Sequence, residues 1–181
     1  MIMTVDELKR YIDTDEEVQV LEAKLQALEL QIRGYTSNNF TLRHWGRLAD
    51  IAGGKFEMDD AVPYEAGDTV QVSGMRNVGL YTVKEVINDT TFTVNEKVYD
   101  DIDAYVVKVD YPMDVKMGAV NLMQYELTSR DKAGIASETI SRHSVTYADQ
   151  SAENNAMGYP MALLGFLQPY MKARFGRGVR A

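Results

Sequence analysis

The chain has 181 residues, 45% of them apolar and 25% charged, so one domain, or one domain with a small insert, can form a packed core. The formal net charge of −8 argues against a protein that binds DNA over its whole surface, because neutralising phosphates requires clustered lysine and arginine. The lack of cysteine excludes disulfides, thiolate metal sites and cysteine nucleophiles, and it fits a protein made in a reducing cytoplasm.

The N-terminal segment predicts two helices. Thr4 and Glu7 have the capping-box spacing, in which each side chain satisfies an amide of the first turn, so a short helix should run to about residue 12. Thr14 and Glu17 repeat this spacing before a second helix, which should end at Gly34 because glycine readily takes the left-handed cap conformation. The apolar residues of the second helix form one core-facing stripe, consisting of Val18, Leu21, Leu25, Leu28 and Ile32.

Residues 35–53 are expected to form a loop and a short helical piece, and a strand-rich block follows them. Apolar and polar residues alternate in VKEVI and TFTV, and an Asn-Asp pair separates the two, so these segments predict a hairpin. Four or five short strands are expected within residues 54–111, as in small antiparallel β-barrels of the SH3-like kind. From Lys55 to Tyr111 the chain has twelve acidic and five basic side chains, so nearly all of the net charge lies in this block.

The segment after the block predicts a helix and then an extended stretch. Pro112 suits the first turn of a helix from Met113 to Ser129, which is apolar almost all round and should be buried on most sides. The following ASETISRHSVTYAD predicts an extended stretch whose apolar anchors are Ile140, Val145 and Tyr147.

The C-terminal segment predicts a final helix and a basic tail. Pro160 should open this helix, and Pro169 inside it should produce a kink, because proline removes a main-chain hydrogen bond. The last ten residues contain four basic side chains and no acidic one. Together the elements predict an α+β fold, in which residues 1–53 and 112–181 form a helical bundle and residues 54–111 form an inserted β-barrel.

No complete catalytic or metal-binding motif is present. His143 has Asp149 nearby in sequence, but the G-x-S-x-G nucleophile elbow is absent, so a surface or interface role is the stronger interpretation. Asp100, Asp101 and Asp103 resemble the start of a calcium loop, but the required glycine and closing glutamate are missing, and a solvated acidic turn is expected. We therefore predict no catalytic residue, no metal site and no cofactor.

Membrane association is not expected either. The N-terminus MIMTVDELKRYI has no long apolar run behind a basic start, which argues against a signal peptide. No segment approaches the roughly 20 apolar residues that a membrane span requires.

Several short motifs lie outside the strand-rich block in a definite order. They are the start TVDELKRYI, the helix end IRGY with the following NNF, the segment GIASE leading into SVTY, and GYP with the closing LQPY. This order resembles the head-tail connector family of long-tailed bacteriophages, also called adaptor or head completion proteins. Typical members are compact and helical, so the strand-rich block is a departure from the family pattern.

The resemblance implies a structural subunit of the phage neck that is not an enzyme. Such subunits form a homo-oligomeric ring, usually a dodecamer, which binds the portal protein, extends the DNA channel and offers an attachment platform to a neck or tail completion protein. DNA would pass through the channel without specific binding, which an acidic surface favours through repulsion. The protein would be made in the host cytoplasm and would reside in the virion.

Two sets of residues are candidate contacts under this reading. The basic tail, with one aromatic anchor, is a hypothetical portal-binding segment made of Lys172, Arg174, Phe175, Arg177 and Arg180. The extended stretch is a hypothetical subunit interface made of Ile140, Arg142, His143, Val145 and Tyr147.

Two other classes of protein compete with the connector. One is a binding module whose barrel holds nucleic acid or a peptide. Nucleic-acid barrels present basic grooves with stacking aromatics, whereas this block places Tyr81, Phe92, Tyr99 and Tyr105 among twelve acids. The other is an enzyme, which the sequence hardly supports, since it offers no nucleophile, metal set or phosphate loop.

Overall fold

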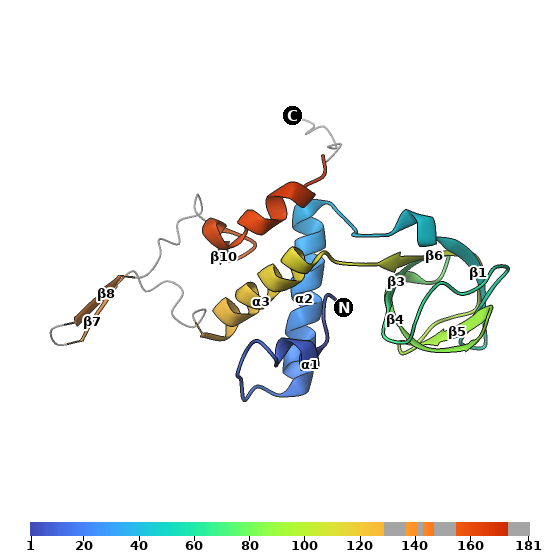
Figure 1. Ribbon diagram of the computed structural model, residues 1–181, viewed down its shortest axis with the longest axis horizontal. Coiled ribbons are helices and arrows are strands. Elements are labelled where there is room, and N and C mark those ends of the chain that lie inside the picture. Colours follow the sequence, from blue (N-terminus) through green and yellow to red (C-terminus); the bar gives the residue numbers. More distant parts are fainter. Residues whose placement is uncertain (129–136, 141–142, 147–154, 174–181) are drawn as a thin grey trace. The chain divides into compact units, whose positions relative to one another are not determined.

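The computed structural model describes residues 1–128, 137–140, 143–146 and 155–173 of the chain (Figure 1). It divides into two compact units. The barrel unit comprises Met1 and residues 39–111, and the helical unit comprises residues 2–38 and those after 111. The chain thus leaves the helical unit once, at residue 38, and returns to it at residue 112.

The barrel unit contains a closed sheet of six antiparallel strands, in the order β1-β2-β5-β4-β3-β6 with β6 pairing back onto β1. The strands are β1 (Arg47–Ala52), β2 (Lys55–Met58), β3 (Thr69–Ser73), β4 (Val78–Asn88), β5 (Thr91–Val94) and β6 (Asp101–Val109). The predicted small antiparallel barrel is confirmed, and the predicted block of residues 54–111 holds five of its strands, β2 to β6. The sixth strand, β1, lies before that block. Because the sheet closes on itself, no strand is left at an edge with its main-chain N–H and carbonyl groups unpaired.

The first barrel strand corrects the expectation for residues 35–53. The helical piece expected there is only the 3₁₀ turn η1 (Arg43–Trp45), and β1 begins two residues later. Side chains alternate in burial along β1, with Ala49 and Ile51 in the core. Ala49 pairs with Met58 of β2 and with Ala104 of β6, so β1 has one partner that follows it directly in the sequence and one that lies far away.

The predicted β4–β5 hairpin is confirmed, and it helps to build an aromatic core. The side chain of Asn88 shapes the turn by accepting the main-chain N–H of Thr90 at 2.9 Å. Within the barrel, the rings of Phe56 and Phe92 stack at 4.7 Å, and the ring of Tyr64 meets Phe92 edge-on at 5.5 Å. Both phenylalanines are fully buried, so this stack anchors the hydrophobic core.

The two ends of the barrel unit lie side by side. The N–H of Leu42 donates to the carbonyl of Lys108, and the N–H of Asp110 donates to the carbonyl of Phe40, both at 2.9 Å. The rings of Phe40 and Tyr111 lie 4.9 Å apart. A segment whose ends adjoin can be inserted into another unit with little strain on the host.

The helical unit contains helices and short strand pairs. The helices are α1 (Val5–Leu8), α2 (Val18–Thr36), α3 (Met113–Thr128), η3 (Met161–Leu163) and η4 (Gly165–Tyr170). The strand pairs are β7 (Ser137–Ile140) with β8 (His143–Thr146), and β9 (Asn155–Ala156) with β10 (Tyr159–Pro160). The predicted stripe of α2 is buried from Leu21 to Ile32, whereas Val18 is half exposed, and α2 contacts α1, α3 and η4 (Figure 1).

Of the two predicted capping boxes, the one at α1 is present and the one at α2 is not. At α1 the capping box is confirmed, since the Oγ1 of Thr4 accepts the N–H of Glu7 at 3.1 Å and the carboxylate of Glu7 accepts the N–H of Thr4 at 2.9 Å. The second capping box is wrong, because the hydroxyl of Thr14 accepts the N–H of Glu16 and no side chain caps α2. The predicted stop at Gly34 is also wrong, since α2 continues to Thr36 and Ser37 takes the left-handed conformation.

The predicted final α-helix is instead a pair of 3₁₀ helices, and Pro160 lies in β10 rather than in a helix. Pro169 has no N–H to donate, and the tighter 3₁₀ geometry is used in short pieces. Leu164 and Leu167 are fully buried, so these two residues of the predicted apolar face do lie in the core, although the helix is of the 3₁₀ type. The hydroxyl of Tyr170 donates to the carboxylate of Asp114 at 2.8 Å, which joins η4 to α3.

A joint also ties the end of η4 to the end of α2. The side-chain amide of Asn38 donates to the carbonyl of Tyr170 at 3.3 Å, and the N–H of Lys172 donates to the carbonyl of Thr36 at 2.8 Å.

Within the part of the chain that the structure describes, no helix is both long and apolar enough to cross a membrane.

Candidate functional site at one end of the barrel

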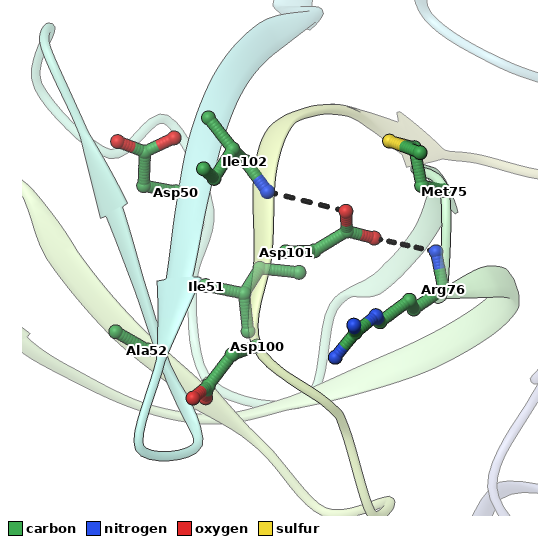
Figure 2. Close-up of a pocket in the computed structure, with 8 residues that line it drawn as sticks. All are labelled: Asp50, Ile51, Ala52, Met75, Arg76, Asp100, Asp101 and Ile102. Atoms are coloured by element: carbon green, nitrogen blue, oxygen red, sulfur yellow. Dashed lines mark hydrogen bonds between the residues drawn. The ribbon is translucent and has the colours of Figure 1, made fainter.

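The most distinctive surface of the barrel unit is the end at which three segments meet. They are the last residues of β1, the turn between β3 and β4, and the start of β6, and together they line a pocket of about 490 Å³ (Figure 2). The lining residues are Asp50, Ile51, Ala52, Met75, Arg76, Asp100, Asp101 and Ile102.

A buried carboxylate holds this end together. Asp101 is 7% exposed, and its Oδ2 accepts the main-chain N–H groups of Arg76 at 2.8 Å and Asn77 at 3.2 Å (Figure 2 draws the first of these). Its Oδ1 accepts the N–H of Ile102 at 3.1 Å. These hydrogen bonds, above all the one from Arg76, hold the pKa of Asp101 below its ordinary value of 3.8 against the opposing effect of burial.

The side chain of Asn77 completes the connection. Its amide donates to the carbonyl of Tyr99 at 2.7 Å and to the carboxylate of Asp101 at 3.2 Å, while its oxygen accepts the N–H of Tyr99 at 2.9 Å. Asn77 is only 1% exposed, so its polar side chain needs hydrogen-bond partners inside the protein. It finds them on the main chain of Tyr99, where it takes the place of a neighbouring strand. Gly74 is required in the turn, since a Cβ there would lie 2.4 Å from the Oδ2 of Asp101.

The two other aspartates of the pocket also accept main-chain amides. Asp50 accepts the N–H of Asp103 at 3.0 Å, and Asp100 accepts the N–H of Gly53 at 2.9 Å. Asp103 itself has a left-handed φ of 53°, at a place where the pairing of β1 with β6 shifts register. The expected solvated acidic turn is thus correct for the exposed Asp100 and Asp103 and wrong for Asp101, whose carboxylate is a structural acceptor.

The rigid frame presents large apolar side chains to solvent. We name these four residues, with their exposed fractions, the barrel-end surface: Met75 (92%), Val78 (73%), Tyr99 (55%) and Ile102 (73%). Exposed apolar residues that are gathered on a fixed frame are typical of a contact site for another macromolecule. Sequence reasoning missed this surface, although the aspartate run at 100–103 pointed to one of the segments that form it.

Among the described residues there is no group of three or more histidine, aspartate or glutamate side chains placed to hold a metal ion. His44, which is exposed, meets the ring of Trp45 edge-on at 5.7 Å, and the ammonium of Lys108 lies 5.7 Å from the same ring while its Nζ is 2.6 Å from Asp68. These contacts tie η1 to the barrel wall.

The residues proposed from the sequence as contacts fall partly outside the described residues. Lys172 is exposed and begins the basic tail, and its main-chain N–H takes part in the joint with α2. Arg174, Phe175, Arg177 and Arg180 lie outside the described residues. Ile140 pairs with His143 in the β7–β8 hairpin, and Val145 pairs with Glu138. Arg142 and Tyr147 lie outside the described residues.

Comparison with known proteins gives no relative. No protein-family model matches the chain, and a search of curated proteins returns no match.

Proposed function

We propose that this chain is a structural subunit of a bacteriophage neck, a ring-forming head-tail connector without enzymatic activity. The observation that carries the proposal is the division of the chain: most of the connector-like motifs belong to the helical unit, NNF runs from Asn38 into the barrel unit, and the barrel interrupts the series. TVDELKRYI contains the capping box and α1, IRGY lies near the end of α2, and LQPY lies in η4, so these motifs shape the unit's own packing. In this proposal the helical unit is the connector scaffold and the SH3-like barrel is a decoration.

The proposed partners are those that the resemblance to connector proteins implies. The portal protein would be bound by the basic tail, through Lys172, Arg174, Phe175, Arg177 and Arg180. Neighbouring subunits of a dodecameric ring would meet at Ile140, Arg142, His143, Val145 and Tyr147, and a neck or tail completion protein would bind the finished ring. The barrel unit has thirteen acidic and seven basic side chains in residues 39–111, which favours the passage of DNA without binding.

Electron microscopy of the full chain mixed with its cognate portal tests the proposal. The expected result is an added ring of density beneath the portal, and portal particles without added density would contradict it. A chain that lacks residues 175–181 should bind the portal less tightly, because it loses the anchor Phe175 and two of the arginines. Unchanged portal binding by the shortened chain would remove the tail from the proposal.

The barrel-end surface favours a second candidate function, the binding of a peptide segment. Met75 and Ile102 stand beside the carboxylates of Asp50 and Asp100, so an extended segment with apolar side chains and a basic group would complement the pocket. Nucleic acid fits less well, because Phe92 is buried in the core and acids outnumber bases in the unit. A gel-shift titration of the full chain at low salt separates the two ligands, since tight binding of single-stranded DNA would favour nucleic acid.

A further inference from the structure

The β7–β8 hairpin forms a sheet of its own. Its strands pair antiparallel over their whole length, from Ser137 opposite Thr146 to Ile140 opposite His143. Within the part of the chain that the structure describes, no third strand joins this sheet, and the two strands have their extensive contacts only with each other. A two-stranded hairpin is at best marginally stable in water, so we expect a partner to complete the sheet.

The register determines which main-chain groups face away from the hairpin. Ile140 and His143 lie opposite each other and only two residues separate them, so this pair must exchange both of its main-chain hydrogen bonds. Hydrogen-bonded and non-bonded pairs alternate along an antiparallel ladder, so the next pair and the fourth pair point their groups outward. The outward N–H and carbonyl groups belong to Ser137 and Thr139 in β7 and to Ser144 and Thr146 in β8.

The two outer edges are complementary. Each edge offers an N–H and a carbonyl at every second residue, and β7 runs antiparallel to β8. When β7 of one copy lies beside β8 of another, the pairing is therefore antiparallel, as it is within the hairpin. Neither strand contains proline or lysine, the residues that natural edge strands use to prevent such pairing, and half of the residues are β-branched.

A second copy of the chain fits these edges better than a strand from a different protein. One foreign strand covers one edge and leaves the other exposed, whereas hairpins set side by side around an axis satisfy both edges of every copy. Charge favours the meeting of unlike edges. β7 contains the acid Glu138, and β8 contains His143 and no acid, so pairing β7 with β8 avoids the two glutamates that a β7–β7 contact would bring together.

We propose that β7 of one copy pairs with β8 of the next, so that the hairpins of neighbouring subunits form one continuous antiparallel sheet. The contact joins two different edges of the same molecule, so it is heterologous and can close into a ring. This inference deepens the ring-forming part of the proposed function and rests on it. It gives the interface a main-chain contact through Ser137, Thr139, Ser144 and Thr146.

Proline substitutions test the contact in the full chain. Thr139→Pro removes an outward N–H of β7 and Ser144→Pro removes one of β8, and proline is tolerated at edge positions whose N–H is not used within the sheet. Thr139→Val and Ser144→Val are the matched controls, because valine also removes the hydroxyl but keeps the N–H. Assembly is measured by sedimentation velocity of each chain alone and by electron microscopy on the cognate portal. Each proline variant should assemble about tenfold less than the natural chain, and each valine variant should match it.

A mixture of the two proline variants shows whether the prolines block edges or unfold the hairpin. The Thr139→Pro chain keeps its β8 edge and the Ser144→Pro chain keeps its β7 edge, so the two chains can still pair once. The expected result is pairs of unlike chains without a complete ring, under whichever condition the natural chain assembles. A mixture that forms no such pairs would overturn the proposal.

Three further outcomes would also reject it. Loss of assembly in only one proline variant would show that like edges pair, and equal loss in the valine variants would show that side chains carry the contact. A ring on the portal that both proline variants still form would reject edge pairing and leave the connector function standing. Assembly that only proline reduces, in a chain that adds no ring to the portal, would keep the edge pairing and reject the connector. A natural chain that assembles in neither condition would overturn both.

Discussion

The side chain of Asn77 pairs with the main chain of Tyr99 in both directions, donating to its carbonyl at 2.7 Å and accepting its N–H at 2.9 Å. An amide side chain thus makes the two hydrogen bonds that a neighbouring strand would otherwise make. Since the same side chain touches Asp101, one residue ties the β3–β4 turn to the start of β6.

Replacing Asn77 by alanine should therefore destabilise the protein. The change leaves the N–H and carbonyl of Tyr99 without these partners at a part-buried site, at a cost of about 1 to 3 kcal/mol. Urea unfolding measures the loss, and the exposed Asn95→Ala is the matched control, with an expected change below about 0.5 kcal/mol. Equal stability of the two variants would contradict the role given to Asn77.

Replacing Asp101 by asparagine should change the dependence of stability on pH. The pKa of Asp101 is held below 3.8 in the folded state, so its carboxylate contributes stability that is complete above that pH and is lost as the pH falls below it. The variant should be less stable than the natural protein at pH 7, and the difference should shrink below pH 3.8.

Urea titrations of both proteins from pH 7 down to pH 2.5 give the comparison. The exposed Asp103→Asn is the control, because asparagine also tolerates the left-handed conformation at that position. A difference between Asp101→Asn and the natural protein that stays constant through the acid range would argue against this assignment.

Removing the hydroxyl of Tyr64 should change the dependence of stability on pH at the alkaline end of the range. It is 3% exposed, its hydroxyl reaches the carbonyls of Trp45 and Val106 at 2.9 Å, and burial raises its pKa above 10.0. Tyr64→Phe should lose about 1 kcal/mol at pH 8, because the carbonyls lose their donor. Above pH 10 the unfolded natural chain ionises this tyrosine while the folded chain does not, so the advantage of the natural protein should decline there. Denaturation curves at pH 8 and pH 11 check both parts, and an advantage that grows with pH would refute the second.

Replacing two helical glycines by alanine should change the stability of the protein in opposite directions. A Cβ on Gly34 in α2 would meet no atom within 4 Å beyond its own stretch of helix, so Gly34→Ala should stabilise the protein by about 0.5 to 1 kcal/mol through helix propensity. In α3 a Cβ on Gly118 would lie 2.4 Å from the ring of Phe166, so Gly118→Ala should cost about 1 to 3 kcal/mol despite the same gain in propensity. Thermal unfolding of both variants decides the matter, and stabilisation by both would show that α3 and η4 are not closely packed.

Local signals in the sequence predicted the elements whose partners are near in the chain. The capping box of Thr4 and Glu7 lies within four residues, and the turn at Asn88 joins adjacent strands, so both were predicted correctly. The box at Thr14 and Glu17 was wrong because the N-cap of α2 is Glu17, three residues after Thr14, and spacing alone cannot distinguish a cap from a local turn.

Periodicity and composition were enough to establish the helical stripe of α2, the presence of helix α3 and the presence of a strand-rich acidic block, because these features need no distant partner. The tertiary structure was needed to show that residues 47–52 are a strand, because they pair with β2 on one side and with β6, about 50 residues away, on the other, and this pairing rather than local preference selects the conformation. It was needed for the candidate site as well. Asn77, Asp101 and the four residues of the barrel-end surface come from two segments, 75–78 and 99–102, which the pairing of β3 with β6 brings to one end of the barrel.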